Sequence, residues 1–292
     1  MSSENLGEPA IGIIGGSGLY EMEGFEEITE RAVATPFGDP SDKVVMGKIG
    51  GRRVCFLPRH GVGHRILPTE INHRANIWAL RSLGVRWLIS ITAVGSLREE
   101  MAPRDIVVPD QLLDRTATAG KHTFFGNGIV GHVGFGEPYC MDLRAHLLAA
   151  AQSIAPKVHD GGVFVCMNGP AFSTRAEAAF HRLIGCDIIG MTNGPETRLA
   201  REAEIAASAL ALVTDYDCWR EDEEAVDVGT VVANVQANSS IAKRIIRDVV
   251  GRIPLVPESL SHRALDTAIM TPRNLWPTGT LEDLAPILGR FG

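Results

Sequence analysis

The chain has 292 residues, of which 45% are hydrophobic and 22% charged, the composition of an ordinary globular protein. Its net charge of −7 argues against a broad nucleic-acid-binding surface, and no apolar run approaches the roughly 18–20 residues that a membrane span needs. Five scattered cysteines without a CxxC pair exclude the usual thiol-ligated zinc site and predict a reduced, cytoplasmic protein, and the N-terminal MSSENLGEPA lacks the pattern of a signal peptide.

Short apolar runs alternate with helical patterns along the whole chain. The apolar runs predict strands over 10–14, 43–49, 53–57, 87–91, 106–108, 162–167, 187–189 and 207–213. Helical spacing predicts helices over 71–83, 143–151, 174–184, 195–205 and 231–249, with a short one at 281–288. Gly50 and Gly51 indicate a hairpin, Thr174 and Glu177 fit a capping box, and Asn238 interrupts the apolar stripe of the long helix.

The order of these elements favours one fold class. Several strands are apolar nearly throughout, which is typical of strands that are buried on both faces. The sequence therefore predicts an α/β fold, a single domain over 1–292 with a central mixed β-sheet flanked by helices. The proline-rich part from about residue 252 is expected to be a C-terminal arm or a docking segment.

The first strand leads into a glycine-rich turn, Gly15-Gly16-Ser17-Gly18. The dinucleotide fingerprint GxGxxG fails because Glu21 stands where its third glycine belongs, and no GxxxxGK triphosphate loop is present. A hydroxyl and free backbone N–H groups suit a small anion. A tight turn that needs glycine only for its positive φ is an equally open interpretation.

Polar residues follow three further strands and strengthen the anion interpretation. They are Arg59 and His60 after 53–57, Thr92 and Ala93 at the end of 87–91, and Met191-Thr192-Asn193-Gly194-Pro195-Glu196 after 187–189. Loops at the carboxyl ends of strands are where α/β sheets bind ligands, and a helix N-terminus attracts anions. An arginine can grip phosphate oxygens in bidentate fashion, and a histidine beside it can donate a further hydrogen bond.

Two acidic residues, Asp215 and Asp217, follow the strand at 207–213. Residues two apart on an extended segment point the same way, so both carboxylates are expected to face one pocket. They can accept hydrogen bonds from ligand N–H groups, or donate to a ring nitrogen if one is protonated. A helix N-cap and a metal site are the alternatives, although no histidine with ligand spacing lies nearby.

Eight segments in fixed order resemble one known family. They are IGIIGGSGLY, TPFGDPSD, RHGVGH, NHRANIWAL, GSLREEMAPRDIVVPDQLLDRT, GPAFSTRAE, MTNGPE and TDYDCW. Together they resemble the trimeric purine nucleoside phosphorylase family, and TDYDCW resembles its methylthioadenosine-type members rather than those that act on 6-oxopurines. The resemblance implies phosphorolysis of 5′-methylthioadenosine to adenine and 5-methylthioribose 1-phosphate, a step of purine and methionine salvage, by a homotrimer. It implies inorganic phosphate as co-substrate and no metal or organic cofactor.

The resemblance also implies roles for individual residues. Phosphate is expected to bind Ser17, Arg59, His60, Thr92, Ala93 and Thr192. Asp215 is expected to face N7 of the purine and Asp217 its exocyclic amine, with Ser173 beside them as a third catalytic residue. The remaining substrate contacts are expected from Met191 under the ribose, Phe172 at the base, Val228 and Val231 around the methylthio group, and His132 donated by a neighbouring subunit.

The chain departs from the family pattern in places. Asn193 and Gly194 fill a slot where threonine and valine are common, Ser17 replaces a frequent threonine, and 119–136 and the part beyond 252 match poorly. The alternative within the family is a 6-oxopurine nucleoside or 5′-methylthioinosine phosphorylase. A non-catalytic nucleotide- or phosphate-binding protein is the alternative from another class.

Overall fold

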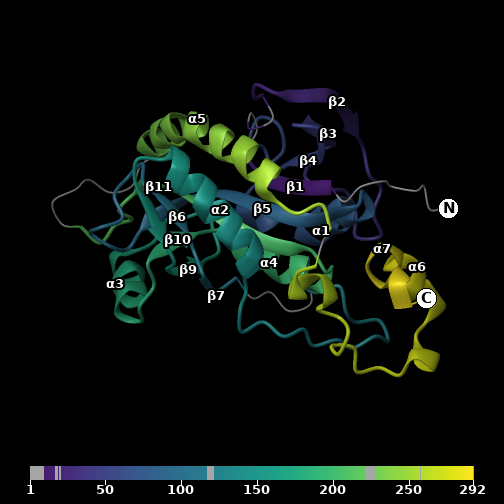
Figure 1. The fold of residues 1–292 in the computed structure, drawn as a ribbon. Coiled ribbons are helices and arrows are strands. Elements are labelled where there is room, and N and C mark those ends of the chain that lie inside the picture. Colours follow the sequence, from purple (N-terminus) through teal and green to yellow (C-terminus); the bar gives the residue numbers. More distant parts are fainter. Residues whose placement is uncertain are drawn as a thin grey trace.

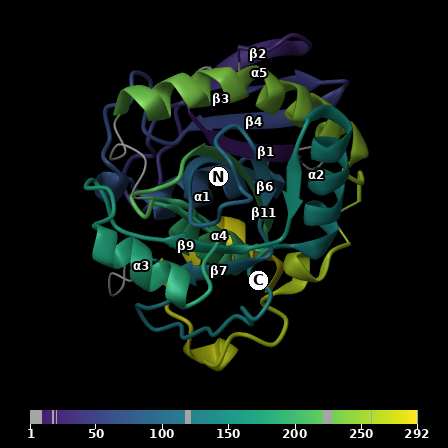
Figure 2. The same cartoon turned by 90° about the vertical axis from the view of Figure 1, so that its left-hand side faces the viewer.

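A single mixed sheet with helices on both faces forms the centre of the structure, a computed structural model (Figure 1). The structure describes residues 10–16, 19, 21–116, 122–220, 228–256 and 258–291, without the side chains of Val228 and Thr230. Figure 2, turned by 90°, shows the long helix α5 (Val228–Arg252) running across the top of the strands.

Eleven strands of the described residues join in the sheet. They are β1 (Ala10–Gly15), β2 (Phe25–Arg31), β3 (Val44–Ile49), β4 (Arg52–Pro58), β5 (Val85–Ser96), β6 (Ile106–Val108), β7 (Gln111–Asp114), β8 (Val158–Asp160), β9 (Val163–Cys166), β10 (Ile188–Gly190) and β11 (Ala206–Asp215). The main order is β2-β3-β4-β1-β5-β10-β9-β7, and β11 pairs with β5 and β6. β1 runs parallel to β4 and β5, and β11 runs parallel to β5, whereas β3 is antiparallel to β4. The prediction of a mixed sheet is confirmed.

Two layers of helices cover the sheet. The helices besides α5 are α1 (His73–Ser82), α2 (Met141–Ile154), α3 (Arg175–Leu183), α4 (Asn193–Glu202), α6 (Thr278–Asp283) and α7 (Ala285–Leu288), and short 3₁₀ turns are η1 (Pro68–Glu70), η2 (Leu260–Arg263), η3 (Arg273–Leu275) and η4 (Gly289–Phe291). Apolar side chains of α2 and α5 pack with those of β1, β5 and β11 in one buried cluster. A second cluster joins α1, α4 and the C-terminal helices.

Most predicted elements are confirmed, with differences at polar or short segments. The hairpin of β3 and β4 and the capping box of α3 are present. β2, β7 and β8 were not predicted, because β2 exposes six of its seven residues and the other two have four and three residues. Asn238 is buried on α5, where its side chain donates to the carbonyl of Val213 at 3.4 Å, so it does not interrupt the packed stripe.

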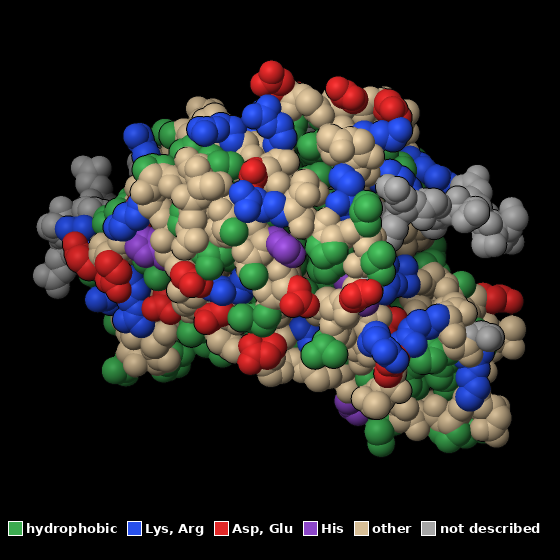
Figure 3. All heavy atoms as spheres, in the orientation of Figure 1, with side chains coloured by type: hydrophobic (Ala, Val, Ile, Leu, Met, Phe, Trp, Pro, Cys, Tyr) green, Lys and Arg blue, Asp and Glu red, His purple; other side chains and the backbone are tan. Residues whose placement is uncertain are grey.

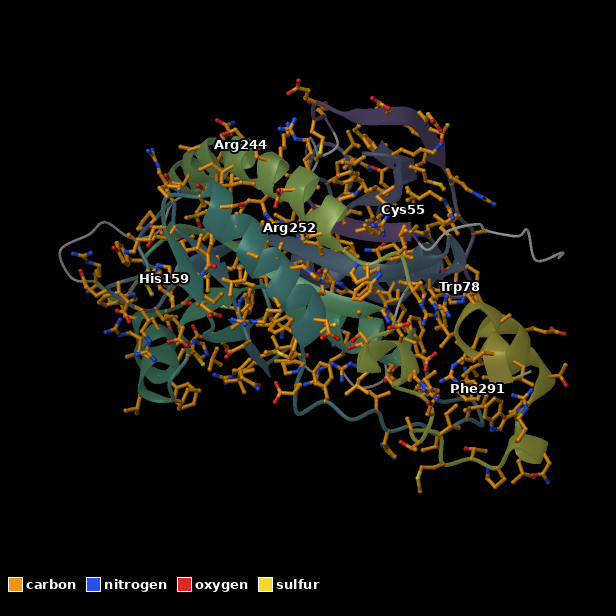
Figure 4. The ribbon with its side chains drawn as sticks, in the orientation of Figure 1. Cys55, Trp78, His159, Arg244, Arg252 and Phe291 are labelled. Atoms are coloured by element: carbon orange, nitrogen blue, oxygen red, sulfur yellow. The ribbon has the colours of Figure 1, made fainter. Side chains whose placement is uncertain are left out.

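The C-terminal segment packs against its own chain, beside α1 in Figure 1. Leu284, Ile287 and Leu288 are buried in the cluster that contains Ile77 of α1. Trp78, labelled in Figure 4, lies next to the C-terminal helices, and its Nε1 donates to the carbonyl of residue 283 at 2.8 Å. Several residues beyond 252 are therefore packed into the hydrophobic core of their own chain.

The molecular surface shows no large patch of one charge on the face drawn in Figure 3, where acidic and basic side chains alternate. Among the helices that the structure describes, none combines the length and apolar character needed to cross a membrane.

Candidate active site

The carboxyl ends of β1, β4, β5 and β11 meet at one edge of the sheet, because these four strands are parallel. The backbone N–H of Arg59, just after β4, donates to the carbonyl of Gly15 at 2.9 Å. Asp215, at the end of β11, pairs with Gly95 of β5. Ala93 is the exposed position of the otherwise covered strand β5. Arg59, Ala93 and Asp215 thus lie at a common edge of the sheet.

Arg59 has a guanidinium group that is held mainly by the protein itself. Its Nε and Nη2 donate to the two carboxylate oxygens of Glu196 at 2.5 and 2.9 Å. Nη2 also donates to the Ser90 hydroxyl, and Nη1 donates to the Ile91 carbonyl, both at 2.9 Å. The Nε/Nη2 edge therefore binds Glu196, so a bidentate contact with phosphate through this edge would need another arrangement of the side chain. Nη1 has one hydrogen-bond partner within the described part of the chain, the Ile91 carbonyl, so one of its N–H groups is without a described partner.

His60 also differs from its expected state. Its Nδ1 lies 2.8 Å from the carbonyl of Ile66, and its ring stacks on His64 with centroids 4.2 Å apart. Burial lowers the pKa of His60 to about 4, so the ring is neutral near pH 7. A neutral ring that donates Nδ1–H to a carbonyl presents Nε2 as an acceptor, so donation from the His60 ring to phosphate requires that the ring gains a proton.

The other predicted phosphate residues have different outcomes. Thr192 is the residue before α4, and its hydroxyl makes no capping hydrogen bond to the described residues of that helix. Thr92 is buried, with its hydroxyl donating to the Ala93 carbonyl at 3.2 Å. Ser17 lies outside the described residues. Thr192 therefore leaves the N-terminus of α4 without a side-chain cap among the described residues, which suits an anion there.

The two aspartates lie together, although the reason given from the sequence is wrong. β11 ends at Asp215, and Asp217 has φ of 52°, so the two do not share an extended segment. Asp215 Oδ1 instead accepts the backbone N–H of Asp217 at 2.8 Å, and its Oδ2 accepts the Thr214 hydroxyl at 2.7 Å. A Cβ at Gly95 would lie 2.9 Å from Asp215 Oδ1, so glycine there gives the carboxylate its room.

Both carboxyl groups hold a proton more readily than a free aspartate. Burial raises the pKa of Asp215, opposed by the hydrogen bonds from Thr214 and Asp217. Burial also raises the pKa of Asp217 to about 6, opposed by the nearby Ser173 hydroxyl and helped by the charge of Asp215. Asp217 Oδ2 is buried and has no hydrogen-bond partner among the described residues. The pair therefore combines a candidate proton donor with an unfilled acceptor.

The loop before α3 lies against this acidic pair. Cys218 Sγ, next to Asp217, contacts the Ser173 carbonyl at 3.1 Å, and Phe172 is exposed. Met191 lies behind the neighbouring loop, because a Cβ at Gly169 would meet its sulfur at 2.6 Å. The structure thus brings Ser173 to the aspartates as expected. Met191 lines a cavity of about 340 Å³. Among the described residues, no other predicted site residue lines this cavity.

The predicted methylthio contacts are only partly placed. Val231 is half-buried in the first turns of α5, and the side chain of Val228 lies outside the described set. His132 is exposed, and its backbone N–H donates to the Ala268 carbonyl at 2.9 Å. His132 therefore lies with the C-terminal segment of its own chain and contributes no described contact to the two aspartates.

Three positions that contact Arg59 or Asp215 were given no role of their own from the sequence: Glu196, Ser90 and Gly95. Glu196 carried a signal, since a glutamate in the first turn of a helix expected to bind an anion needs a nearby cation. Ser90 and Gly95 lie within β5 and had no such signal. Within the described ranges, no three His, Cys, Asp or Glu side chains gather as a metal site would require.

The Asn193-Gly194 slot has a structural partner in β7. A Cβ at Gly194 would lie 2.6 Å from the Asp114 carboxyl carbon, and that carboxylate is fixed by Thr116 and by Arg198 at 2.7 Å. We expect Gly194→Val to lower the free energy of unfolding by about 1–3 kcal/mol, the usual cost of overpacking. Urea unfolding measures the effect, and in Asp114→Ala the same valine should cost clearly less. Equal costs in both backgrounds would contradict the assigned clash.

Comparisons with known proteins agree with this geometry. Residues 10–251 match the family model of the phosphorylase superfamily. The chain is 52% identical over 284 residues to S-methyl-5′-thioadenosine phosphorylase of Geobacter sulfurreducens, covering 97% of this chain and 99% of the relative. It is 51% identical to the enzyme of that name from Gloeobacter violaceus, covering 96% of this chain and 95% of the relative.

Solved structures give the same result. A methylthioadenosine phosphorylase from an Antarctic soil metagenomic library is similar with a TM-score of 0.91 and 44% identity, over 96% of this chain and 99% of that chain. Methylthioadenosine phosphorylase from Schistosoma mansoni in complex with adenine is similar with a TM-score of 0.83 and 37% identity, over 91% of this chain and 100% of that chain. The chain therefore belongs to the phosphorylase superfamily and, within it, to the S-methyl-5′-thioadenosine phosphorylase family.

Proposed function

We propose that this protein catalyses phosphorolysis of 5′-methylthioadenosine to adenine and 5-methylthioribose 1-phosphate. One observation carries the choice of substrate: Asp217 presents a buried, unpartnered carboxylate oxygen beside Asp215, whose pKa is raised. A buried acceptor next to a proton donor suits the amine and N7 edge of adenine. The relatives' names and the adenine bound to one of them support the same substrate.

The phosphate acts first as a charge beneath the sugar. Cleavage of the C1′–N9 bond places positive charge on the ribose, and a phosphate held there stabilises this charge and attacks C1′. The proposed phosphate groups are the free Nη1 N–H of Arg59, the N-terminus of α4 with Thr192, and the Ser17 loop. His60 adds a hydrogen bond when it is protonated.

The purine leaves with negative charge, which Asp215 neutralises. As a carboxylic acid it donates its proton to N7 while the bond breaks. The Thr214 hydroxyl and the Asp217 N–H fix its two oxygens and so orient it. The proton moves from Asp215 to adenine, and the phosphate oxygen replaces N9 on C1′.

Asp217 selects the purine. Its carboxylate accepts from a 6-amino group, whereas a 6-oxo group would place two acceptors against each other in a dry site. Met191 underlies the ribose, Phe172 and Ser173 line the base, and Val228 and Val231 surround the methylthio group in this proposal. An apolar pocket rejects an added hydroxyl by only about 10²-fold, so adenosine is a slower substrate.

Comparison of two nucleosides tests this assignment. Purified protein is incubated with 5′-methylthioadenosine or with 5′-methylthioinosine, with and without phosphate, and the free base is measured. The proposal requires release of adenine that depends on phosphate and is much faster than release of hypoxanthine. Faster reaction of the 6-oxo nucleoside would make the alternative within the family correct, and binding without turnover would favour a non-catalytic protein.

Acidic pH is expected to weaken the preference for the amino substrate. Below its pKa of about 6, Asp217 carries a proton that can be donated to a 6-oxo group. The ratio of kcat/KM for 5′-methylthioadenosine to that for 5′-methylthioinosine should therefore fall as pH drops from 8 to 5, by up to roughly tenfold per pH unit. In Asp217→Asn, which has no proton to gain, the ratio should be flat with pH. A flat ratio in the unmodified protein would contradict the role of Asp217.

We also propose a homotrimeric assembly in the cytoplasm, with phosphate as co-substrate and without metal or organic cofactor. In this assembly the exposed His132 of one subunit reaches the methylthio end of a neighbouring site. Analytical ultracentrifugation measures the oligomeric state. Full phosphorolysis activity in a variant that stays monomeric would contradict a need for His132 of the neighbouring subunit.

A further inference from the structure

Glu196 occupies an unusual place for an acidic residue. It lies in the first turn of α4, four residues after Thr192, and its side chain is 1% exposed. A helix N-terminus that is meant to bind phosphate is a poor place for a second anion, since the two would compete for the same positive end. The contacts of Glu196 explain why the site tolerates it.

Both carboxylate oxygens of Glu196 accept hydrogen bonds, from Arg59 itself or from Ser90. Oε1 accepts from Arg59 Nε, and Oε2 accepts from Arg59 Nη2 and, at 2.7 Å, from the Ser90 hydroxyl. The Ser90 hydroxyl in turn accepts from Arg59 Nη2 at 2.9 Å. Three groups therefore form a closed buried network in which the guanidinium plane has one orientation.

The neighbouring histidine does not compete for Glu196. Nδ1 of His73 lies 4.0 Å from Glu196 Oε1, and burial lowers the pKa of His73 to about 4, so its ring is neutral near pH 7. Burial acts to raise the pKa of Glu196, but the charge and hydrogen bonds of Arg59 outweigh it and lower the pKa overall. Arg59 and Glu196 are thus a neutralised pair, and the carboxylate does not repel an anion at the start of α4.

We propose that Glu196 is the positioning residue of the phosphate site, which orients Arg59 through a bidentate contact supported by Ser90 and directs the remaining Nη1 N–H to the phosphate. This inference rests on the proposed function and assigns no contact between Glu196 and either substrate. If this inference is correct, replacement of Glu196 should raise the KM for phosphate and leave the KM for the nucleoside largely unchanged.

Glu196→Gln tests the inference because it keeps the shape and removes the charge. The glutamine NH₂ faces the N–H groups of Arg59, so the guanidinium should turn away from its position. We expect the KM for phosphate to rise about 10- to 100-fold, which corresponds to the usual worth of a hydrogen bond to a charged group. The KM for 5′-methylthioadenosine should change less than about twofold, within the error of such comparisons.

A second readout needs no nucleoside. Inorganic phosphate should raise the Tm of the unmodified protein, and this shift should be largely lost in Glu196→Gln. Failure of the proposed function would appear separately, as no adenine from the unmodified protein, whereas the thermal shift tests the orientation of Arg59 alone. Ser90→Ala is the milder variant if Glu196→Gln does not fold, and it should raise the phosphate KM by about 3- to 10-fold, because the bidentate contact between Arg59 and Glu196 remains.

Glu204→Gln is the matched control. Glu204 is another fully buried carboxylate that binds an arginine in bidentate fashion, Arg290, but it lies with the C-terminal segment. It should lower Tm without changing the KM for phosphate. A folded Glu196→Gln or Ser90→Ala protein with unchanged phosphate KM would overturn the inference, and so would an equal rise of both KM values.

Discussion

Asp215→Asn is expected to lower kcat by about 10²–10⁴-fold, the range for loss of a general acid, while phosphate affinity stays nearly unchanged. Asparagine can still offer an N–H to N7, but it has no proton to transfer as the C1′–N9 bond breaks. Burial raises the pKa of Asp215, opposed by the hydrogen bonds from Thr214 and Asp217, and the Thr214 hydroxyl orients the group. Steady-state kinetics with both substrates varied measures the effect.

Asp217→Asn gives the contrast for this prediction. Asp217 recognises the amine in our account, so its replacement should raise the KM for 5′-methylthioadenosine more than Asp215→Asn does. The phosphate-dependent rise in Tm should be intact in both variants. If Asp215→Asn lost phosphate binding to the same degree as turnover, its role as acid would be wrong and a structural role at the end of β11 would replace it.

Arg290→Leu is expected to lower the free energy of unfolding by about 2–4 kcal/mol, somewhat less than the loss of a fully buried partner because Arg290 is itself 39% exposed. Glu204 has a completely buried side chain whose carboxylate binds Arg290 and the backbone N–H of Leu265. Without the arginine this carboxylate keeps one hydrogen bond among the described residues, from the backbone N–H of Leu265. Urea unfolding followed by tryptophan fluorescence measures the change.

Arg263→Leu is the control for the C-terminal segment. Arg263 pairs with Asp266 at 2.8 Å, but its side chain is 75% exposed, and exposed pairs contribute only about 0–1 kcal/mol. Equal effects of the two substitutions would contradict the idea that Glu204 ties this segment to the core. Activity assays at a temperature where both variants stay folded separate stability from function.

The predictable parts of the fold are those in which the local pattern of apolar residues indicates burial. β1 and β11 are buried along almost their whole length, as their uninterrupted apolar runs predict. β2 was missed because it lies at the edge of the sheet with charged residues exposed. α4 begins at Asn193, whereas the sequence predicts a start at Pro195. The prediction starts too late because asparagine and glycine are weak helix formers and proline is common at the first position of a helix.

The parts that were not predictable depend on partners far away in the chain. Arg59 and Glu196 are 137 residues apart, and Arg290 and Glu204 are 86 apart, so neither ion pair has a local pattern. The motifs predict roles for Arg59 and Asp215, and the structure gives the contacts of both side chains. Their local geometry was not predictable, because a left-handed φ at Asp217 and a buried pair at Arg59 follow from packing that only the structure contains.

Analysis of the sugar product tests the central claim most directly. Protein in excess over 5′-methylthioadenosine is mixed with phosphate, and after one turnover the sugar is identified by its mass. The account predicts one 5-methylthioribose 1-phosphate for each adenine, and no adenine when phosphate is omitted. Free 5-methylthioribose, or adenine released equally without phosphate, would show water as the nucleophile and contradict the account.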